Sequence, residues 1–234
     1  MRRNVAVVLA GGSGRRMESA TPKQFLALAG RLVIEHAVEA FQVNESIDEI
    51  AIVGAEGYES ELQDLVARNG WSKVGKLLVG GRERYHSSLA AIRAYAGAED
   101  TNLIFHDAAR PLVSQRIIDG VARALEVYSA VCVAVKSTDT VLVVEDGIIR
   151  RIPDRRSLMC SQTPQAFRLE VIAQAYDRAL RDPGFAATDD CGVVLNYLPG
   201  VDIHIVCGEE KNMKLTYKDD IRLMEALIAA NSCR

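Results

Sequence analysis

The chain has 234 residues, of which 49% are hydrophobic and 25% are charged, and its formal net charge is -3. This composition is typical of a globular protein, and the length suits one large domain, so we expect a single domain over residues 1–234. The slightly negative charge argues against a general nucleic-acid binder, and the first apolar run is too short for a membrane span. An anionic ligand must therefore be held by local positive charge.

Apolar strand patterns alternate with helical patterns over the first two thirds of the chain. Such alternation predicts an α/β fold with a mostly parallel sheet flanked by helices, and it places ligands beyond the carboxyl ends of the strands. The predicted elements, in chain order, are a strand at Val5–Ala10, a helix at Val33–Phe41, a strand at Glu49–Val53, a helix at Tyr58–Arg68, a strand at Lys76–Val79, a helix through Ser88 and Tyr95, a strand at Asn102–Phe105, a helix at Ile117–Tyr128 and a strand at Ala130–Val135.

The pattern changes after Val135 to two short β-branched runs, Thr140–Val144 and Ile148–Ile152, around a turn that contains Asp-Gly. Asp-Gly between such runs is typical of a hairpin. Two strands alone are marginally stable in water, so we expect residues 137–156 to form a projecting β-arm that a second subunit covers, which predicts a homodimer. The remaining predicted elements are helices at Leu169–Leu180, Cys191–Tyr197 and Asp219–Ala230 and a strand at Asp202–Val206.

The five cysteines are odd in number and widely scattered, without the paired spacing of zinc or redox motifs. We expect them to be small, buried apolar side chains in a protein of the reducing cytoplasm. The amino terminus leads directly into the first strand, so neither a signal peptide nor a membrane anchor is expected. Four scattered histidines also argue against a transition-metal site.

The first strand runs into a glycine-rich loop, Leu9-Ala10-Gly11-Gly12-Ser13-Gly14-Arg15-Arg16-Met17, and Pro22-Lys23-Gln24 follows it closely. Glycines let backbone amides approach an anion, and two arginines and a lysine can balance the charge of a triphosphate. A dinucleotide-binding fingerprint would need a glycine in place of Met17 and an acid after the next strand, and the glycine-lysine-serine/threonine of a P-loop is absent. The loop is therefore predicted to bind the phosphates of a nucleotide by another arrangement.

Further motifs follow along the chain: Gly80-Gly81 through Arg84 to Ser87, His106-Asp107-Ala108-Ala109-Arg110-Pro111, Asp139-Thr140, Asp154-Arg155, Gln162-Thr163-Pro164-Gln165, Thr188-Asp189-Asp190 and Asn212-Met213-Lys214-Leu215-Thr216. With the glycine loop, and in this order, they resemble the nucleotidyltransferases and more closely the cytidylyltransferases of the IspD type. That family makes 4-diphosphocytidyl-2-C-methyl-D-erythritol from CTP and 2-C-methyl-D-erythritol 4-phosphate, for isoprenoid precursors. The resemblance covers nearly the whole chain and implies a Rossmann-like nucleotidyltransferase fold and a CTP-dependent enzyme.

The resemblance also implies roles for residues around CTP. The positions of Arg16 and Lys23 contact its phosphates as negative charge builds, and Lys214 closes the site over the reacting groups. We therefore expect these three residues to be catalytic. The residues that the resemblance places around CTP are Leu9, Ala10, Gly11, Gly12, Gly14, Gly81, Arg82 and Ser87.

His106-Asp107 lies where a predicted strand ends, which is the expected place for a functional carboxylate in an open sheet. The resemblance places Asp107 near the acceptor polyol or the metal, with Arg110 nearby, whereas His106 is expected to be structural. The implied metal is Mg²⁺, held by triphosphate oxygens and by one carboxylate, that of Asp107.

The acceptor carries a phosphate of its own, and the resemblance implies that Thr140 and Arg155 bind it. Thr188 matches a contact to the polyol. Because Thr140 and Arg155 lie on or beside the arm, each site would combine residues of two chains.

Two acceptors stay open. Leu9-Ala10-Gly11-Gly12, Ile152-Pro153-Asp154-Arg155 and Ser161-Gln162-Thr163-Pro164 resemble the ribitol 5-phosphate cytidylyltransferases, whereas the His106–Pro111 and Thr188–Asp190 motifs suit the methylerythritol group. We place 2-C-methyl-D-erythritol 4-phosphate first and ribitol 5-phosphate second. A sugar-1-phosphate nucleotidyltransferase and a catalytically silent binding protein are alternatives from other classes.

Overall fold

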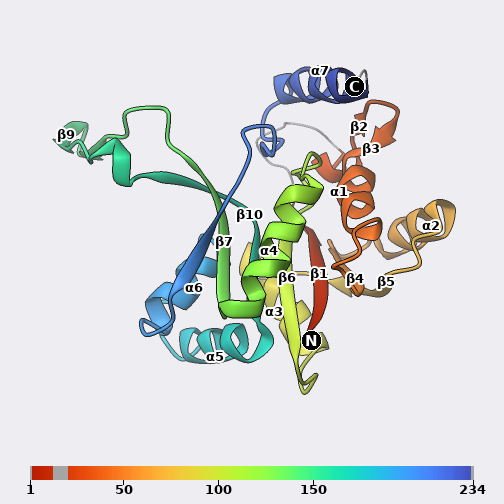
Figure 1. Ribbon diagram of the computed structural model, residues 1–234, viewed down its shortest axis with the longest axis horizontal. Helices are drawn as coiled ribbons and strands as arrows, with labels where there is room; N and C mark the ends of the chain where they lie inside the picture. Colours follow the sequence, from red (N-terminus) through yellow and green to blue (C-terminus); the bar gives the residue numbers. More distant parts are fainter. Residues whose placement is uncertain (1, 13–20, 233–234) are drawn as a thin grey trace.

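In the computed structural model, which describes residues 2–12 and 21–232, seven strands form a twisted central sheet in the order β11-β7-β10-β6-β1-β4-β5 (Figure 1). β10 is antiparallel to both of its neighbours, and the other strand pairs are parallel. The predicted α/β fold with a mostly parallel sheet is therefore confirmed. The strands are β1 Arg3–Ala10, β4 Glu49–Gly54, β5 Val74–Val79, β6 Thr101–Asp107, β7 Ala130–Lys136, β10 Met159–Arg168 and β11 Ile203–Cys207.

Helices cover both faces of the sheet. Successive residues of β1 point to opposite faces, and its apolar side chains are buried on both. Ala6 and Val8 pack with α1, α2 and α4 on one face, and Val5 and Val7 pack with α3, α5 and α6 on the other. The helices predicted from apolar periodicity are all present, with ends that differ by a few residues. They are α1 Val33–Gln42, α2 Glu59–Asn69, α3 Arg84–Ala94, α4 Gln115–Val127, α5 Leu169–Ala179, α6 Asp190–Tyr197 and α7 Asp219–Ser232.

Strand β10, in the middle of the sheet, is missing from the sequence prediction. Its segment Ser161-Gln162-Thr163-Pro164-Gln165 is polar and contains proline, which is usually confined to edge strands or bulges. The structure accommodates Pro164 because the pairing with β7 shifts register between Ser161 and Gln165. Gln162, Thr163 and Gln165 are buried at this bulge, beside the carboxyl end of β6, whereas Ser161 is exposed.

A small third layer closes the end of the sheet where β1 and β6 finish. Leu28, from the short hairpin of β2 (Ala27–Leu28) and β3 (Arg31–Leu32), packs with Leu215 and with Met224 of α7. Figure 1 shows α7 lying over this end, beside the β2–β3 hairpin. The segment around Leu215 is thereby held above the carboxyl edge of the sheet.

The predicted hairpin is present and projects from the body of the molecule (Figure 1). It consists of β8 Val143–Glu145 and β9 Ile148–Arg151, which are shorter than predicted, and both turn residues, Asp146 and Gly147, have positive φ. Several of its apolar side chains are exposed in the single chain, among them Val144, Ile148 and Ile149. Pairing with a second subunit and the arm limits 137–156 stay predictions.

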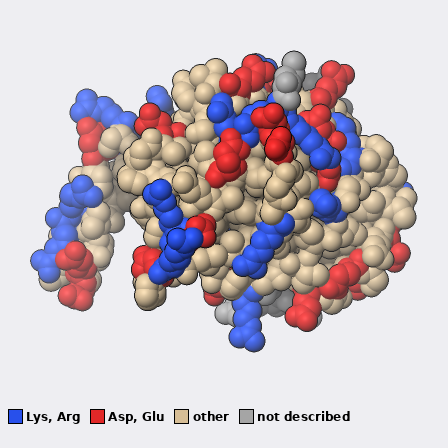
Figure 2. All heavy atoms as spheres, turned by 90° about the horizontal axis from the view of Figure 1, so that it is seen from below, with Lys and Arg blue, Asp and Glu red and all other residues tan. Residues whose placement is uncertain are grey.

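The cysteine prediction is wrong for two of the described residues. Cys132 is buried, but Cys160 and Cys207 are exposed, since they lie toward the ends of β10 and of the edge strand β11. Within the described ranges, no helix is both long and apolar enough to cross a membrane. The face seen in Figure 2 carries Lys and Arg interspersed with Asp and Glu rather than one broad basic surface.

Candidate functional site

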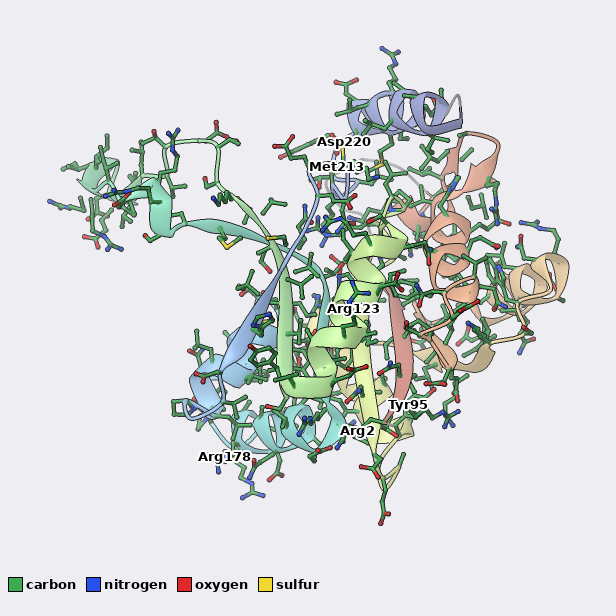
Figure 3. The ribbon with its side chains drawn as sticks, in the orientation of Figure 1. Arg2, Tyr95, Arg123, Arg178, Met213 and Asp220 are labelled. Carbon is green, nitrogen blue, oxygen red and sulfur yellow. The ribbon has the colours of Figure 1, made fainter. Side chains whose placement is uncertain are left out.

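A cleft with a volume of about 150 Å³ opens at the carboxyl edge of the sheet. Its walls come from the loop after β1, the β5–α3 connection, the end of β6 and the segment that follows β11. Figure 3 labels Met213 on that last segment and Asp220 at the start of α7. The lining residues are Leu9, Gly11, Gly12, Lys23, Gln24, Gly81, Arg82, Glu83, Arg84, Ser87, Asp107, Ala108, Ala109 and Lys214.

The loops that end β1 and β5 both lie close to side chains at the start of α3, and their glycines make this approach possible. A Cβ added to Gly80 would overlap the hydroxyl of Ser87, and one added to Gly81 would lie 2.7 Å from Cβ of His86. A Cβ on Gly11 would lie 3.0 Å from the same Ser87 hydroxyl. Glycine is required here by close approach, which leaves the loop backbones lining the cleft.

The turn at Lys23–Phe25 is fastened to the end of β1. Gln24 is buried and donates a hydrogen bond from Nε2 to the carbonyl of Ala10 at 2.6 Å. Nζ of Lys23 donates to the carbonyl of Leu215 at 3.0 Å. The two lysines predicted to contact phosphates, Lys23 and Lys214, therefore line one cleft although 191 positions separate them in the sequence.

Asp107 is the acidic centre of the site. Its Oδ2 accepts a hydrogen bond from Nζ of Lys214 at 2.6 Å, and its Oδ1 lies 3.5 Å from Nε of Arg84. Burial alone would raise the pKa of Asp107, but the positive charges of Arg84 and Lys214 hold it well below its usual range. The carboxylate is therefore ionised at neutral pH.

A second hollow lies on the other side of these residues. Its walls come from β6, β10 and the segment before α6. Arg84, Asp107 and Lys214 line both hollows and form the partition between them. The lining residues are Arg84, Asp107, Arg110, Ser161, Gln162, Thr163, Gln165, Thr188, Asp189 and Lys214.

Arg110 is fixed at the rim of the second hollow. Its Nη1 donates to the carbonyl of Asn212 at 2.8 Å, and burial lowers its pKa although Asp107 opposes the shift. Nε of Arg110 is buried without a hydrogen-bond partner. Arg110 also lines the second hollow, where its positive charge can attract an anion.

His106 is fully buried directly before Asp107, as expected for a structural residue. Its Nδ1 lies 3.1 Å from Oγ1 of Thr163 and its Nε2 lies 3.0 Å from the carbonyl of Arg110. Burial lowers the pKa of His106 to about 4, so the ring is neutral at physiological pH.

The structure brings together most of the residues predicted for CTP. Ala10 does not line the cleft, and its carbonyl accepts the hydrogen bond from Gln24. Arg16 and Gly14 lie outside the described residues. Those that line the first cleft are Leu9, Gly11, Gly12, Lys23, Gly81, Arg82, Ser87 and Lys214, and Asp107, which was predicted for the acceptor and the metal, lines it as well.

The acceptor prediction divides into two groups. Arg110 and Thr188 line the second hollow, together with Asp107. Thr140 and Arg155 are exposed on and beside the arm and line neither hollow of their own chain. Nη1 of Arg155 donates to the carbonyl of Thr138 at 3.0 Å. A single chain therefore does not bring these two residues to the rest of the site.

Several lining residues received no role from the sequence, although their motifs had been recognised. Arg84 stands inside the glycine motif after β5, and its burial between two carboxylates appears only in the fold. Ser161, Gln165 and Asp189 form a hydrogen-bonded group in the second hollow, because Nε2 of Gln165 donates to Oγ of Ser161 at 3.1 Å and to Oδ2 of Asp189 at 2.7 Å.

The side chains of the site fit Mg²⁺ only if the phosphate oxygens of the nucleotide supply most of the ligands of the ion. Within residues 2–12 and 21–232, no cluster of three His, Cys, Asp or Glu side chains is placed to hold a metal. Mg²⁺ usually keeps several waters and needs one or two carboxylates beside phosphate oxygens. Asp107 can supply one such carboxylate, since it is ionised and lines the cleft.

Comparisons with known proteins show to which family the chain is related. The family model described as IspD, 2-C-methyl-D-erythritol 4-phosphate cytidylyltransferase, matches residues 4–230. A 2-C-methyl-D-erythritol 4-phosphate cytidylyltransferase of Thermobifida fusca is 46% identical over 232 residues, which cover 97% of this chain and 93% of that protein. A bifunctional ribulose 5-phosphate reductase/CDP-ribitol pyrophosphorylase of Haemophilus influenzae is 40% identical over 98% of this chain and 49% of its own length.

A solved structure supports the same relationship. The crystal structure of a 4-diphosphocytidyl-2C-methyl-D-erythritol synthase from Anaerococcus prevotii is 27% identical, has a TM-score of 0.83 and covers 97% of this chain and 99% of that one. The match of the family model to almost the whole sequence, with a site at the predicted edge of the sheet, establishes that this chain belongs to the IspD family of cytidylyltransferases, which are CTP-dependent nucleotidyltransferases.

Proposed function

We propose that this protein transfers CMP from CTP to the phosphate of 2-C-methyl-D-erythritol 4-phosphate and releases pyrophosphate. The observation that carries the proposal is the pair of adjoining hollows that share Arg84, Asp107 and Lys214 as their partition. One hollow has a glycine-lined wall suited to a nucleotide, and the other is lined by hydroxyl, amide and charged groups suited to a phosphorylated polyol. The reacting groups would meet at the partition.

The chemistry requires two anions to approach each other. A phosphate oxygen of the acceptor attacks the α-phosphorus of CTP in line, the bond to the β-phosphate oxygen breaks, and pyrophosphate leaves with those electrons. No covalent enzyme intermediate is needed, because the barrier is lowered by positioning and by neutralising charge. Lys23 and Lys214 lie on the nucleotide side and Arg110 on the acceptor side, and Arg16 stays a predicted contributor.

The loops after β1 and β5 would hold the rest of the nucleotide. Gly11, Gly12 and Gly81 line the cleft without side chains. Backbone amides and carbonyls can bond the carbonyl and amino group of cytosine as well as phosphate oxygens. Ser87 is almost fully buried, and its hydroxyl lies close to Gly11 of one loop and Gly80 of the other. Arg82 at the outer rim would add positive charge.

Mg²⁺ is the proposed metal, and Asp107 is the residue that would hold it beside the triphosphate. When bound, the ion supplies positive charge to the phosphate oxygens. The chain's own part is to keep Asp107 ionised and oriented, which Arg84 and Lys214 do.

We further propose that the arm pairs with a second subunit and carries Thr140 and Arg155 to the acceptor site of that subunit. The exposed Val144, Ile148 and Ile149 on the hairpin support this arrangement, because an isolated hairpin with an uncovered apolar surface is marginally stable. A cytoplasmic location, expected from the scattered cysteines, is likewise part of the proposal.

Ribitol 5-phosphate is the second candidate acceptor. It is favoured by the 40% identity to the Haemophilus influenzae protein and by the polar lining of the second hollow, which offers many partners to additional hydroxyl groups. The higher identity to the Thermobifida fusca protein places methylerythritol phosphate first.

Pyrophosphate release tests the proposal. Purified protein is incubated with CTP, Mg²⁺ and either polyol phosphate, with UTP, GTP and dTTP as controls for the nucleotide. We expect release with CTP and 2-C-methyl-D-erythritol 4-phosphate. Turnover of ribitol 5-phosphate alone would transfer the assignment to the second candidate, and CTP binding without release under either acceptor would contradict an enzymatic role.

A further inference from the structure

A buried chain of charges continues behind the partition. Asp190, the first residue of α6, has no exposed surface and lines neither hollow. Its Oδ2 lies 2.7 Å from Nη1 of Arg84, and Arg84 in turn contacts Asp107 through Nε. Asp190 is therefore one residue removed from the proposed reacting groups.

Asp190 is itself held from two directions. The hydroxyl of Tyr176, on α5, donates to its Oδ1 at 2.6 Å, and its backbone amide donates to Oε1 of Gln165 at 3.0 Å. Because both carboxylate oxygens are engaged, the side chain has one fixed orientation. This anchoring joins α5, α6 and β10 behind the site.

Arg84 connects the fixed side chain of Asp190 to the partition. A guanidinium group is planar and carries its N–H groups at fixed angles, so holding Nη1 with one carboxylate sets the direction in which Nε points. Asp190 and Asp107 raise the pKa of Arg84 against the lowering effect of burial. The cation is permanently charged and sits between two carboxylates, one of which lies in the site and the other behind it.

We propose that Asp190 is a positioning residue for CMP transfer, which acts through Arg84 to hold Asp107 and Lys214 in their working orientation between the two hollows. This inference rests on the proposed function, in which Asp190 contacts neither substrate. The same contact couples the Thr188–Asp190 segment, at the acceptor side, to the nucleotide side of the partition.

The alternative is that Asp190 serves folding alone. Buried ion pairs are weak evidence for stability, because the cost of removing two charges from water offsets their attraction. A folding role predicts that substitution lowers the free energy of unfolding and leaves turnover per folded molecule unchanged. A positioning role predicts a fall in kcat that passes through Arg84.

A double-mutant cycle separates these roles. Asp190→Asn and Arg84→Met are measured singly and together for kcat, for KM of both substrates and for thermal unfolding. We expect each single variant to lower kcat roughly 10- to 100-fold, as small misplacements at reacting groups do, with KM for CTP changed less than about threefold. The double variant should be no slower than Arg84→Met alone, because Asp190 acts only through Arg84.

Charge alone should not restore the function. Arg84→Lys keeps a positive charge but offers one ammonium in place of two separated N–H groups, so we expect its kcat to stay close to that of Arg84→Met. Glu35→Gln breaks a separate ion pair with Arg68, between α1 and α2, and is the matched control. It should lower the unfolding temperature and keep kcat within about twofold.

Wild-type kcat in Asp190→Asn, fully additive losses in the double variant, or full activity in Arg84→Lys would each overturn the inference. If Asp190→Asn does not fold, the Asp190→Ala/Arg84→Met variant removes both charges from the buried site, and wild-type kcat in that protein would overturn it equally. Wild-type protein that releases no pyrophosphate would refute the proposed function instead, before any variant is compared.

Discussion

The carboxyl edge of the sheet and the projecting arm differ in how far their charged side chains are exposed to solvent. At the edge, the side chains of Asp107 and Arg84 are only 12% and 23% exposed, and each has a charged partner within its own chain. On the arm side, Asp154 and Arg156 form an ion pair in which the side chains are 54% and 90% exposed. One region is organised by a single chain, and the other presents its polar and apolar groups to solvent.

This difference shows how far one chain can build the site. Ordered, partly buried groups at the edge can act on a substrate without further rearrangement. Thr140 and Arg155 instead need something to bring them to an acceptor, which the proposed second subunit would do. Substitutions in the two regions should therefore differ in kind as well as in size.

The largest effect is expected at the edge. Lys23→Ala or Lys214→Ala should lower kcat by roughly 10²–10³-fold, as the loss of a preorganised charge at a transition state does. Steady-state pyrophosphate release measures it. Lys218→Ala, an exposed lysine four positions after Lys214, is the matched control and should retain wild-type turnover. Near-normal kcat in folded Lys23→Ala and Lys214→Ala protein would remove both residues from the mechanism.

Arg16→Ala extends the same comparison to the loop outside the described residues. We expect a loss of kcat of roughly 10²–10³-fold, because the resemblance places this arginine on the triphosphate. A variant that binds and turns over CTP normally would confine the phosphate contacts to Lys23 and Lys214.

The next largest effect is expected on assembly. Ile149→Glu places a charge on the exposed apolar surface of the arm, so the proposed dimer should dissociate and activity should fall with it. Sedimentation velocity measures the assembly. Leu195→Glu changes an equally exposed apolar residue on α6 and should leave the dimer intact. A wild-type protein that sediments as a fully active monomer would contradict the role of the arm.

A smaller kinetic effect is expected for the polar residues of the arm. Thr140→Ala and Arg155→Ala should raise KM for the acceptor about tenfold and leave KM for CTP unchanged, because they are proposed to bind the acceptor phosphate alone. Initial rates at varied concentrations of each substrate distinguish the two constants. An equal rise in both KM values would show that the arm does not discriminate between the substrates.

A pH effect on stability is expected at His106, where both ring nitrogens are engaged. Burial lowers its pKa from 6.5 to about 4, so between these values the unfolded chain binds a proton that the folded chain does not. Stability therefore falls as pH decreases from about 6.5 toward 4, and this residue should account for about 2 kcal/mol between pH 7 and pH 5.

Urea unfolding at both pH values measures this loss, and His106→Asn should reduce it relative to the wild type, whatever its effect on absolute stability. An identical pH dependence in the variant would show that His106 is not the group responsible.

The smallest effect is expected for the exposed pair of the arm. Asp154→Ala should leave both the unfolding temperature and kcat unchanged, because exposed ion pairs contribute little. Differential scanning calorimetry provides the measurement. A clear decrease in the unfolding temperature would mean that this pair is covered in the assembled protein.

The parts that the sequence predicted correctly are those with strong local patterns. The buried run of β1, the periodicity of α1 and the Asp146-Gly147 turn each carry their structure in neighbouring residues. β10 has no such local pattern. Its polar residues and Pro164 fit a strand only because β10 lies between β6 and β7 and its pairing with β7 shifts register.

The site likewise contains residues that the sequence indicates and residues that it does not. Gly81 and Lys23 stand in recognisable motifs, and the cleft brings them together as expected. The contact of Arg84 with both Asp107 and Asp190 joins residues up to 106 positions apart. Only the folded arrangement can reveal such a contact, since nothing in the local sequence of any one of the three residues indicates its partners.

A crystal structure of the protein with CTP and Mg²⁺ bound would show whether the glycine-lined cleft holds the nucleotide. We expect the triphosphate to lie along Gly11 and Gly12 between Lys23 and Lys214, with the α-phosphate facing the partition at Asp107. Nucleotide bound elsewhere, for example in the hollow lined by Arg3 and Arg123 at the far end of the sheet, with the glycine cleft empty, would contradict it.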